Sequence, residues 1–162
     1  MEWLTQLEAL AATAIAMVLG GAVGFERELK DRPAGFRTHM LVAGAAALLV
    51  GVGRLTLDDP AVTETMPSFL RIDPLRLVEA VIAGVAFIGA GTIFGRRGHV
   101  KGITTASSLL MVAVVGIATG FHYYVLAVTA TVLTLAVLAL LGLLDRRPGG
   151  RHRGGNASSS DD

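Results

Sequence analysis

The stretch YYVLAVTATVLTLAVLALLGLL, residues 123–144, carries no charged side chain. A helix needs about 20 predominantly apolar residues to cross the hydrocarbon core of a bilayer, so this stretch predicts a transmembrane helix. Four further apolar runs precede it, over residues 7–25, 40–57, 77–94 and 103–120. The sequence therefore predicts an all-α membrane protein, folded as a bundle of five transmembrane helices.

The first apolar run begins close to the N-terminus, where a secretory signal peptide is the alternative interpretation. The leading residues MEWLTQ contain no Lys or Arg, whereas a signal peptide begins with a positively charged region. The run is also longer than the apolar core of a signal peptide, and it ends at Glu26 and Arg27. We therefore interpret residues 7–25 as a transmembrane helix.

Basic residues are concentrated at alternate ends of the predicted helices. Eleven Lys and Arg lie in 26–38, in 95–102 and after Leu144. Three lie on the opposite side, at Arg54, Arg71 and Arg76. Because cytoplasmic loops carry the excess of Lys and Arg, we expect the N-terminus outside and the C-terminus in the cytoplasm.

Composition limits what else the chain contains. Residues 146–162 are mostly Gly, Arg, Ser and Asp, which predicts a disordered cytoplasmic tail after a transmembrane domain of residues 1–145. The absence of cysteine excludes disulfides and thiolate metal sites. The net charge of +1 gives no indication of nucleic-acid binding. No phosphate loop, dinucleotide fingerprint or nucleophilic triad is visible, so we expect neither an enzyme nor a cofactor.

The densest polar cluster, ERELKDRPAGFRTH at residues 26–39, joins the first two predicted helices. Glu26 with Lys30, and Glu28 with Arg32, have the i,i+4 spacing of helical ion pairs. Pro33 and Gly35 are expected to end the first helix. Thr38 is then expected to cap the second helix, with His39 in its first turn.

Two interpretations of this cluster remain open. One is a loop whose acidic and basic side chains neutralise one another and which fixes the membrane topology. The other is a surface that binds a partner or a ligand. The carboxylates are suitable ligands for a hard divalent cation, although the neighbouring Arg and Lys disfavour a permanently occupied metal site. The candidate binding residues are Glu26, Arg27, Glu28, Arg37, Thr38 and His39.

A second charged group lies at the outer end of the third predicted helix. Glu79 falls one turn inside this helix, and a carboxylate within a span is a functional hypothesis by default. Arg76, three residues earlier, or Arg54 on the second helix would pair with it and explain it without a function. We add Asp73, Arg76 and Glu79 to the candidate binding residues.

Small residues recur at four-residue spacing, as in Gly20 and Gly24. Such spacing lets helix backbones approach closely, either inside the bundle or against another membrane protein. The run GVAFIGAGTI, residues 84–93, also predicts a close contact or a local break in the third helix. The residues expected to serve packing, capping or a break are Gly20, Gly24, Gly84, Gly89, Gly91, Gly102, Thr104 and Thr105.

Small residues in the first half of the chain align with small residues in the second half. A shift of 67 residues aligns Gly24 with Gly91, Gly35 with Gly102, and several other small residues. This alignment would make the first two helices and the next two a parallel repeat, as in some transporter folds. Chance matching in a sequence rich in Gly and Ala is the alternative.

Five motifs occur in order between residues 15 and 120. They are GGAVGFERE (20–28), RPAGFRTHMLV (32–42), DPLR (73–76), FIGAGTI (87–93) and VKGITTAS (100–107). Together they resemble the MgtC/SapB family of bacterial membrane proteins. The resemblance departs at residues 83–87 and at Ser107 and Ser108. It also departs at the C-terminus, where longer members carry a soluble domain.

The resemblance implies a bacterial inner-membrane protein that is tied to growth at low Mg²⁺ and, in some pathogens, to survival inside host cells. It implies regulation of partner membrane complexes, such as the proton-driven ATP synthase, at least as much as transport. We therefore expect a non-enzymatic regulator or accessory factor in Mg²⁺ homeostasis, acting through other membrane proteins or self-association. A transporter or channel subunit for Mg²⁺ or another small solute is the alternative.

Overall fold

The structure, a computed structural model, describes residues 2–64, 73–96 and 99–144. The described helices are α1 (Glu2–Leu29), α2 (Phe36–Asp58), α3 (Pro60–Thr63), α4 (Pro74–Thr92), α5 (Ile103–Gly120) and α6 (Tyr124–Leu144). Two short strands, β1 (Phe94–Arg96) and β2 (His99–Lys101), connect α4 to α5. The tail predicted over 146–162, together with Arg71 and Arg97, lies outside the described residues.

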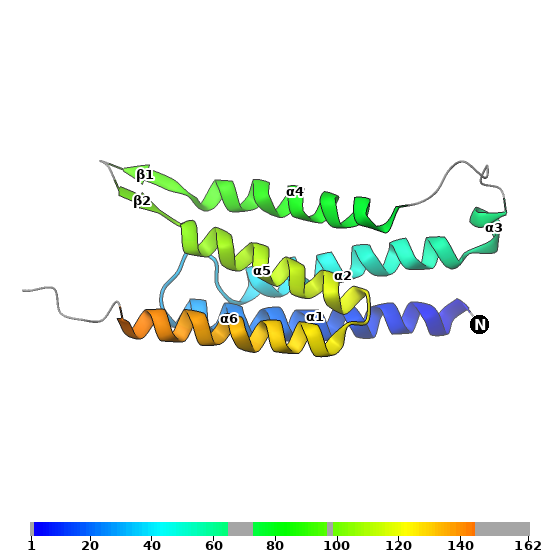
Figure 1. The fold of residues 1–162 in the computed structure, drawn as a ribbon, viewed down its shortest axis with the longest axis horizontal. Helices are drawn as coiled ribbons and strands as arrows, with labels where there is room; N and C mark the ends of the chain where they lie inside the picture. The colour runs from blue at the N-terminus through cyan, green and yellow to red at the C-terminus, as the bar shows by residue number, and fades with distance from the viewer. Residues whose placement is uncertain (1, 65–72, 97–98, 145–162) are drawn as a thin grey trace, which may run out of the picture.

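The long helices run side by side along one axis (Figure 1). Helix α1 packs mainly on α2, and both pack on α5, so these three form the centre of the bundle. Helix α6 covers α5 and α1, whereas α4 packs mainly on α5 at the edge of the bundle. The end of α1, the start of α5 and the end of α6 meet at one end, which we name the inner end.

Among the described residues, four helices are long and apolar enough to cross a membrane. They are Trp3–Leu29, Phe36–Asp58, Pro74–Thr92 and Ile103–Gly120. Each overlaps a run predicted from the sequence, and α6 corresponds to the fifth. Helices α1 and α2 extend beyond the apolar runs because polar residues continue the helix at both membrane boundaries. The chain is thus a largely helical membrane protein.

The prediction of an all-α fold missed one element. Residues 94–101 form an antiparallel hairpin in which Phe94 pairs with Lys101 and Arg96 with His99. Gly102, which follows, has φ +93°, and an added Cβ would collide with the Thr92 carbonyl oxygen. Only glycine fits this left-handed turn easily, so the chain can reverse directly from β2 into α5.

The predicted break in the third helix is wrong, because α4 is continuous from Pro74 to Thr92. Its glycines do not interrupt the backbone ladder of the helix. Gly89 lies against α5, where an added Cβ would be 3.3 Å from that of Ala106. The alternative of a close helix contact therefore applies at this position.

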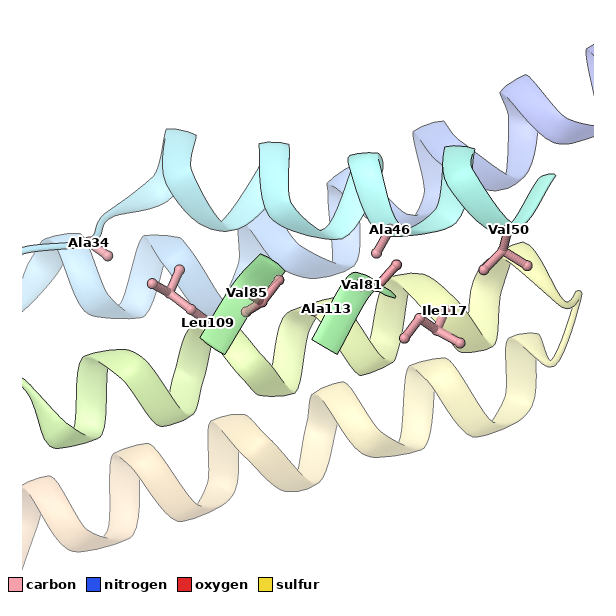
Figure 2. Close-up of a cluster of buried hydrophobic side chains, with 8 residues drawn as sticks. All are labelled: Ala34, Ala46, Val50, Val81, Val85, Leu109, Ala113 and Ile117. Carbon is pink, nitrogen blue, oxygen red and sulfur yellow. The ribbon is translucent and has the colours of Figure 1, made fainter. Parts of the chain in front are cut away.

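One hydrophobic cluster holds α2, α4 and α5 together (Figure 2). Its buried side chains are Ala34, Ala46, Val50, Val81, Val85, Leu109, Ala113 and Ile117. A second cluster joins α1 and α2 to α5 through Ala16, Val23, Ala43, Ala47 and Val112. Both contain many Ala and Val, which allow the helices to approach closely. Dispersion contacts between well-packed helices are what hold such a bundle together in lipid.

Candidate functional site at the inner end of the bundle

The loop between α1 and α2 is organised by Glu28 rather than by Thr38. Glu28 Oε2 accepts a hydrogen bond from the Phe36 backbone N–H over 2.8 Å, which satisfies a free donor in the first turn of α2. The N-cap of α2 is Gly35, which has no side chain with which to cap it. The expectation that Thr38 caps this helix is therefore wrong. Glu28 forms no ion pair with Arg32 among the described residues.

Near the end of α1, Arg27 is buried and its neighbour Glu26 is partly buried. The side chain of Arg27 is 4% exposed and that of Glu26 is 16% exposed. Arg27 Nη1 lies 3.8 Å from Glu26 Oε2, and Lys30 Nζ forms an ion pair with Glu26 Oε1. The expected Glu26–Lys30 pair is thus present.

These contacts leave several buried polar atoms without a hydrogen bond of acceptable geometry among the described residues. They are Nε and Nη2 of Arg27 and both carboxylate oxygens of Glu26, although Oε1 is already held by the ion pair with Lys30. Buried polar groups normally have a partner, and an unsatisfied one costs about 1–3 kcal/mol, more when it is charged. The cluster is therefore chemically incomplete as an isolated unit.

His39 links α2 to α5. It is fully buried, its Nδ1 lies 2.9 Å from the Gly35 carbonyl oxygen, and its Nε2 lies 3.0 Å from Ser108 Oγ. Ser108 Oγ also donates to the Thr105 carbonyl oxygen over 2.8 Å. A carbonyl accepts only, so Nδ1 carries a hydrogen, and a neutral ring needs the single Ser108 hydrogen at Nε2. The hydroxyl therefore has two competing acceptors whenever His39 is neutral.

One face of α1 lies against α6 at the same end. Lys30 Nζ donates to the Leu138 carbonyl oxygen of α6 over 3.0 Å. Val23 packs in a buried cluster against which Leu135 and Leu138 also pack. Residues three and four apart share a helix face, so Arg27 lies on α1 between Val23 and Lys30.

A groove of about 350 Å³ runs between the inner halves of α5 and α6. Thr104, Ser107 and Met111 line it from α5, and Leu133, Thr134 and Leu138 line it from α6. Its walls are almost wholly apolar. Leu138 thus belongs both to the groove and to the contact with Lys30.

The remaining charged candidates do not join this cluster. Arg37, in the first turn of α2, is exposed. Asp73 caps α4, because its Oδ1 accepts from the Leu75 N–H over 2.9 Å. Arg76 and Glu79 are exposed on α4, and no ion pair joins them among the described residues. Arg54 instead donates to the Gly120 carbonyl oxygen over 3.3 Å.

The small-residue candidates divide into two groups. Added Cβ atoms at Gly20 and Gly24 would come within 2.6 Å and 2.8 Å of α2, so these glycines pack internally. Gly84 and Gly91 on α4 have nothing within 4 Å of an added Cβ. Thr104 is exposed at the groove, and buried Thr105 accepts from Ser108.

Sequence reasoning missed two contributors to the site. Lys30 was expected to pair with Glu26 but not to reach α6. Ser108 was noted as a departure from the family pattern, and its partner His39 was not identified. Both contacts link residues more than 60 positions apart, so only the helix arrangement reveals them. No group of three or more His, Asp or Glu within the described ranges is arranged to hold a metal ion.

The helices and the buried charge cluster define a multi-pass helical membrane protein with a polar inner end. The chain belongs to the MgtC family, whose sequence model matches residues 13–147. The motif-based resemblance is thereby confirmed, and with it the assignment to a bacterial multi-pass membrane protein. No solved structure matches the chain.

Three curated relatives place the chain within this family. It is 34% identical over 133 residues to "Putative magnesium transporter YhiD" of Escherichia coli K12, covering 82% of this chain and 60% of the relative. It is 37% identical over 141 residues to "Protein MgtC" of Brucella abortus, covering 87% and 54%. It is 32% identical over 152 residues to "Protein SapB" of Bacillus subtilis, covering 92% and 63%. The chain thus spans between about half and two-thirds of their length.

Proposed function

We propose that this protein is a non-enzymatic regulatory or accessory factor in Mg²⁺ homeostasis that acts by binding other membrane proteins. Its family and the names of its relatives support a link to Mg²⁺. The proposed location is the bacterial inner membrane, with five spans, the N-terminus outside and the C-terminus in the cytoplasm. The asymmetry of Lys and Arg supports this orientation. The 67-residue offset between the starts of α2 and α5 supports the internal repeat.

The observation that carries the proposal is the outward face of α4. Phe87 is 83% exposed, the most exposed large apolar side chain in the described part of the chain. Gly84 and Gly91 lie three and four residues from it, and both are exposed. Glycine lowers helix stability and gains nothing from lipid, whereas a partner helix can approach closely at glycine. This face therefore suits another transmembrane helix.

Transport of Mg²⁺ is the second candidate, favoured by the printed name of the Escherichia coli relative. The residues of α4 that a transport path would use are Glu79 and the glycines of the segment Gly89–Gly91, where a break was expected. Glu79 is exposed at the edge of the bundle, and α4 is continuous. These positions support a lipid-facing or partner-facing surface better than an internal path.

Site-specific photocrosslinking in native membranes tests the partner surface. A photoreactive residue replaces Phe87 on α4 or, as the matched control, Val125 on α6, which is 80% exposed. We expect a discrete protein adduct from position 87 that is lost when Gly84→Ile blocks close approach, and none from position 125. Equal adducts from the two positions would contradict the proposal.

A parallel pull-down tests the inner loop, because Arg37→Ala removes an exposed charge from it. We expect this variant to recover less of the same crosslinked partner. Purified protein in liposomes then separates regulation from transport. Mg²⁺ flux that is abolished by Glu79→Gln would contradict a purely regulatory role.

A further inference from the structure

The two donors of Arg27 that lack a partner lie along one edge of its guanidinium group. Nε and Nη2 are the two donors on one side of the planar guanidinium, and both lack partners while the side chain is 4% exposed. Two parallel N–H donors in this arrangement match the paired oxygens of a phosphate or a carboxylate. Nearby, Glu26 Oε2 supplies the opposite need, because it is a buried acceptor without a hydrogen bond, whereas Oε1 is held by Lys30.

The position of this pair indicates what kind of molecule meets it. Arg27 lies on α1 between Val23, in the cluster on which Leu138 packs, and Lys30, which bonds to Leu138 at the wall of the groove. The groove lies between the first turns of α5 and the later turns of α6, at the inner end (Figure 1). Charged groups at a membrane boundary, next to an apolar groove that runs into the span, are complementary to a lipid.

We propose that one phospholipid binds at this inner site, with an acyl chain in the α5–α6 groove and its phosphate on Arg27. The groove volume of about 350 Å³ lies within the usual range of small-molecule sites, roughly 300–1,000 Å³. Lys30, whose side chain is 28% exposed, is the second donor to the phosphate and marks the side from which the headgroup enters. The partner surface on α4 plays no part in this inference.

Glu26 limits which lipid headgroup the site can bind. Its Oε2 has no hydrogen bond, and its Oε1, which Lys30 holds, also needs a donor once Lys30 turns to the phosphate. An ethanolamine headgroup carries an ammonium beside its phosphate, so it offers a cation to Glu26 and an anion to Arg27. A choline headgroup has the same charges but no N–H donor. The site therefore selects phosphatidylethanolamine over phosphatidylcholine.

Native mass spectrometry of the detergent-purified chain tests this selection. The protein is mixed with equal amounts of phosphatidylethanolamine, phosphatidylglycerol and phosphatidylcholine that share the same acyl chains. We expect one phosphatidylethanolamine to be retained per chain, in preference to the other two. Equal retention of the three lipids would overturn the proposal, as would displacement of the bound lipid by millimolar inorganic phosphate, which would identify a soluble-anion site.

Three variants assign the contacts. Arg27→Lys keeps the charge but loses the paired donors, so lipid retention should fall about tenfold, whereas the exposed Arg32→Lys should leave it unchanged. Glu26→Gln should bring retention of phosphatidylethanolamine down to that of phosphatidylcholine. Ser107→Trp should fill the groove and reduce retention of every lipid, whereas Leu110→Trp, on α5 outside the groove, should not.

The three substitutions affect different contacts with the lipid, so the remaining two still test its binding if one variant fails to fold. Should Arg27→Lys not yield folded protein, Ser107→Trp and Glu26→Gln decide the matter, because each addresses a different part of the lipid. Folded Ser107→Trp protein that retains phosphatidylethanolamine at the level of the unsubstituted chain would overturn the placement of the acyl chain.

Discussion

His39 shows how a single side chain can hold two helices of this bundle at a fixed register. Its two ring nitrogens face the Gly35 carbonyl at the start of α2 and the Ser108 hydroxyl of α5. Gly20 and Gly24 make room for it, because an added Cβ at Gly20 would lie 2.6 Å from the His39 carbonyl oxygen, and one at Gly24 would lie 2.8 Å from the His39 Cβ. The imidazole is therefore held by the Gly35 carbonyl and the Ser108 hydroxyl, and the backbone and Cβ of His39 pack closely on α1.

Removing the partner of His39 is expected to destabilise the protein. Ser108→Ala leaves Nε2 buried without a partner, which should lower the unfolding free energy by about 1–2 kcal/mol. Ser107→Ala is the matched control, because Ser107 is exposed and its hydroxyl bonds only to Ile103 of its own helix. That control should change stability by less than about 0.5 kcal/mol. Unfolding by detergent titration measures both, and equal losses would show that the interhelical bond contributes nothing.

At the scale of the helix, glycines on α5 and on α4 have opposite roles. An added Cβ at Gly116 would overlap the Ala43 carbonyl oxygen, so α5 and α2 pack backbone to backbone there. At Gly84 an added Cβ meets nothing within 4 Å. The first glycine is needed for close packing inside the chain, and the second leaves an outer surface flat.

Alanine substitutions should separate these two roles. Gly116→Ala overpacks the α2–α5 contact and should cost about 1–3 kcal/mol of unfolding free energy. Gly84→Ala removes the helix penalty of glycine and should add roughly 0.5–1 kcal/mol in the purified protein. The same detergent titration reports both effects. A destabilising Gly84→Ala would mean that α4 packs more closely on its own bundle than the structure shows.

The sequence predicted the helices well because long apolar runs and the placement of Lys and Arg depend only on local composition. It also identified Glu26 and Arg27, whose charges interrupt an apolar pattern. It did not predict that Glu28 rather than Thr38 caps α2, because Glu28 lies eight residues before Phe36 and only the path of the loop brings the two together. Nor did it predict the pairing of His39 with Ser108, or of Lys30 with Leu138, which depends on how distant helices pack.

At the scale of the whole molecule, the orientation in the membrane follows from which end holds the basic loops. The inner end carries the loop between α1 and α2 and the hairpin between α4 and α5. The opposite end carries α3, which Asp59 caps, and the turn between α5 and α6. The proposed topology assigns these ends to the cytoplasm and to the exterior respectively.

Single cysteines test that topology without background labelling, since the chain has no cysteine. Glu64→Cys lies at the α3 end, and Arg32→Cys lies in the loop between α1 and α2; both positions are exposed. In intact cells stripped of any outer barrier, a membrane-impermeant maleimide should label position 64 but not position 32. Permeabilisation should then expose position 32. Labelling in the reverse order would require the inverted orientation.

The edge position of α4 has a consequence for how such proteins diversify. Because its outward residues contact nothing else in the described chain, substitutions at Gly84, Phe87 or Gly91 leave the packing of α1, α2 and α5 intact. On the proposed function, binding specificity can therefore change by substitution on this one helix while the packing of the bundle is kept.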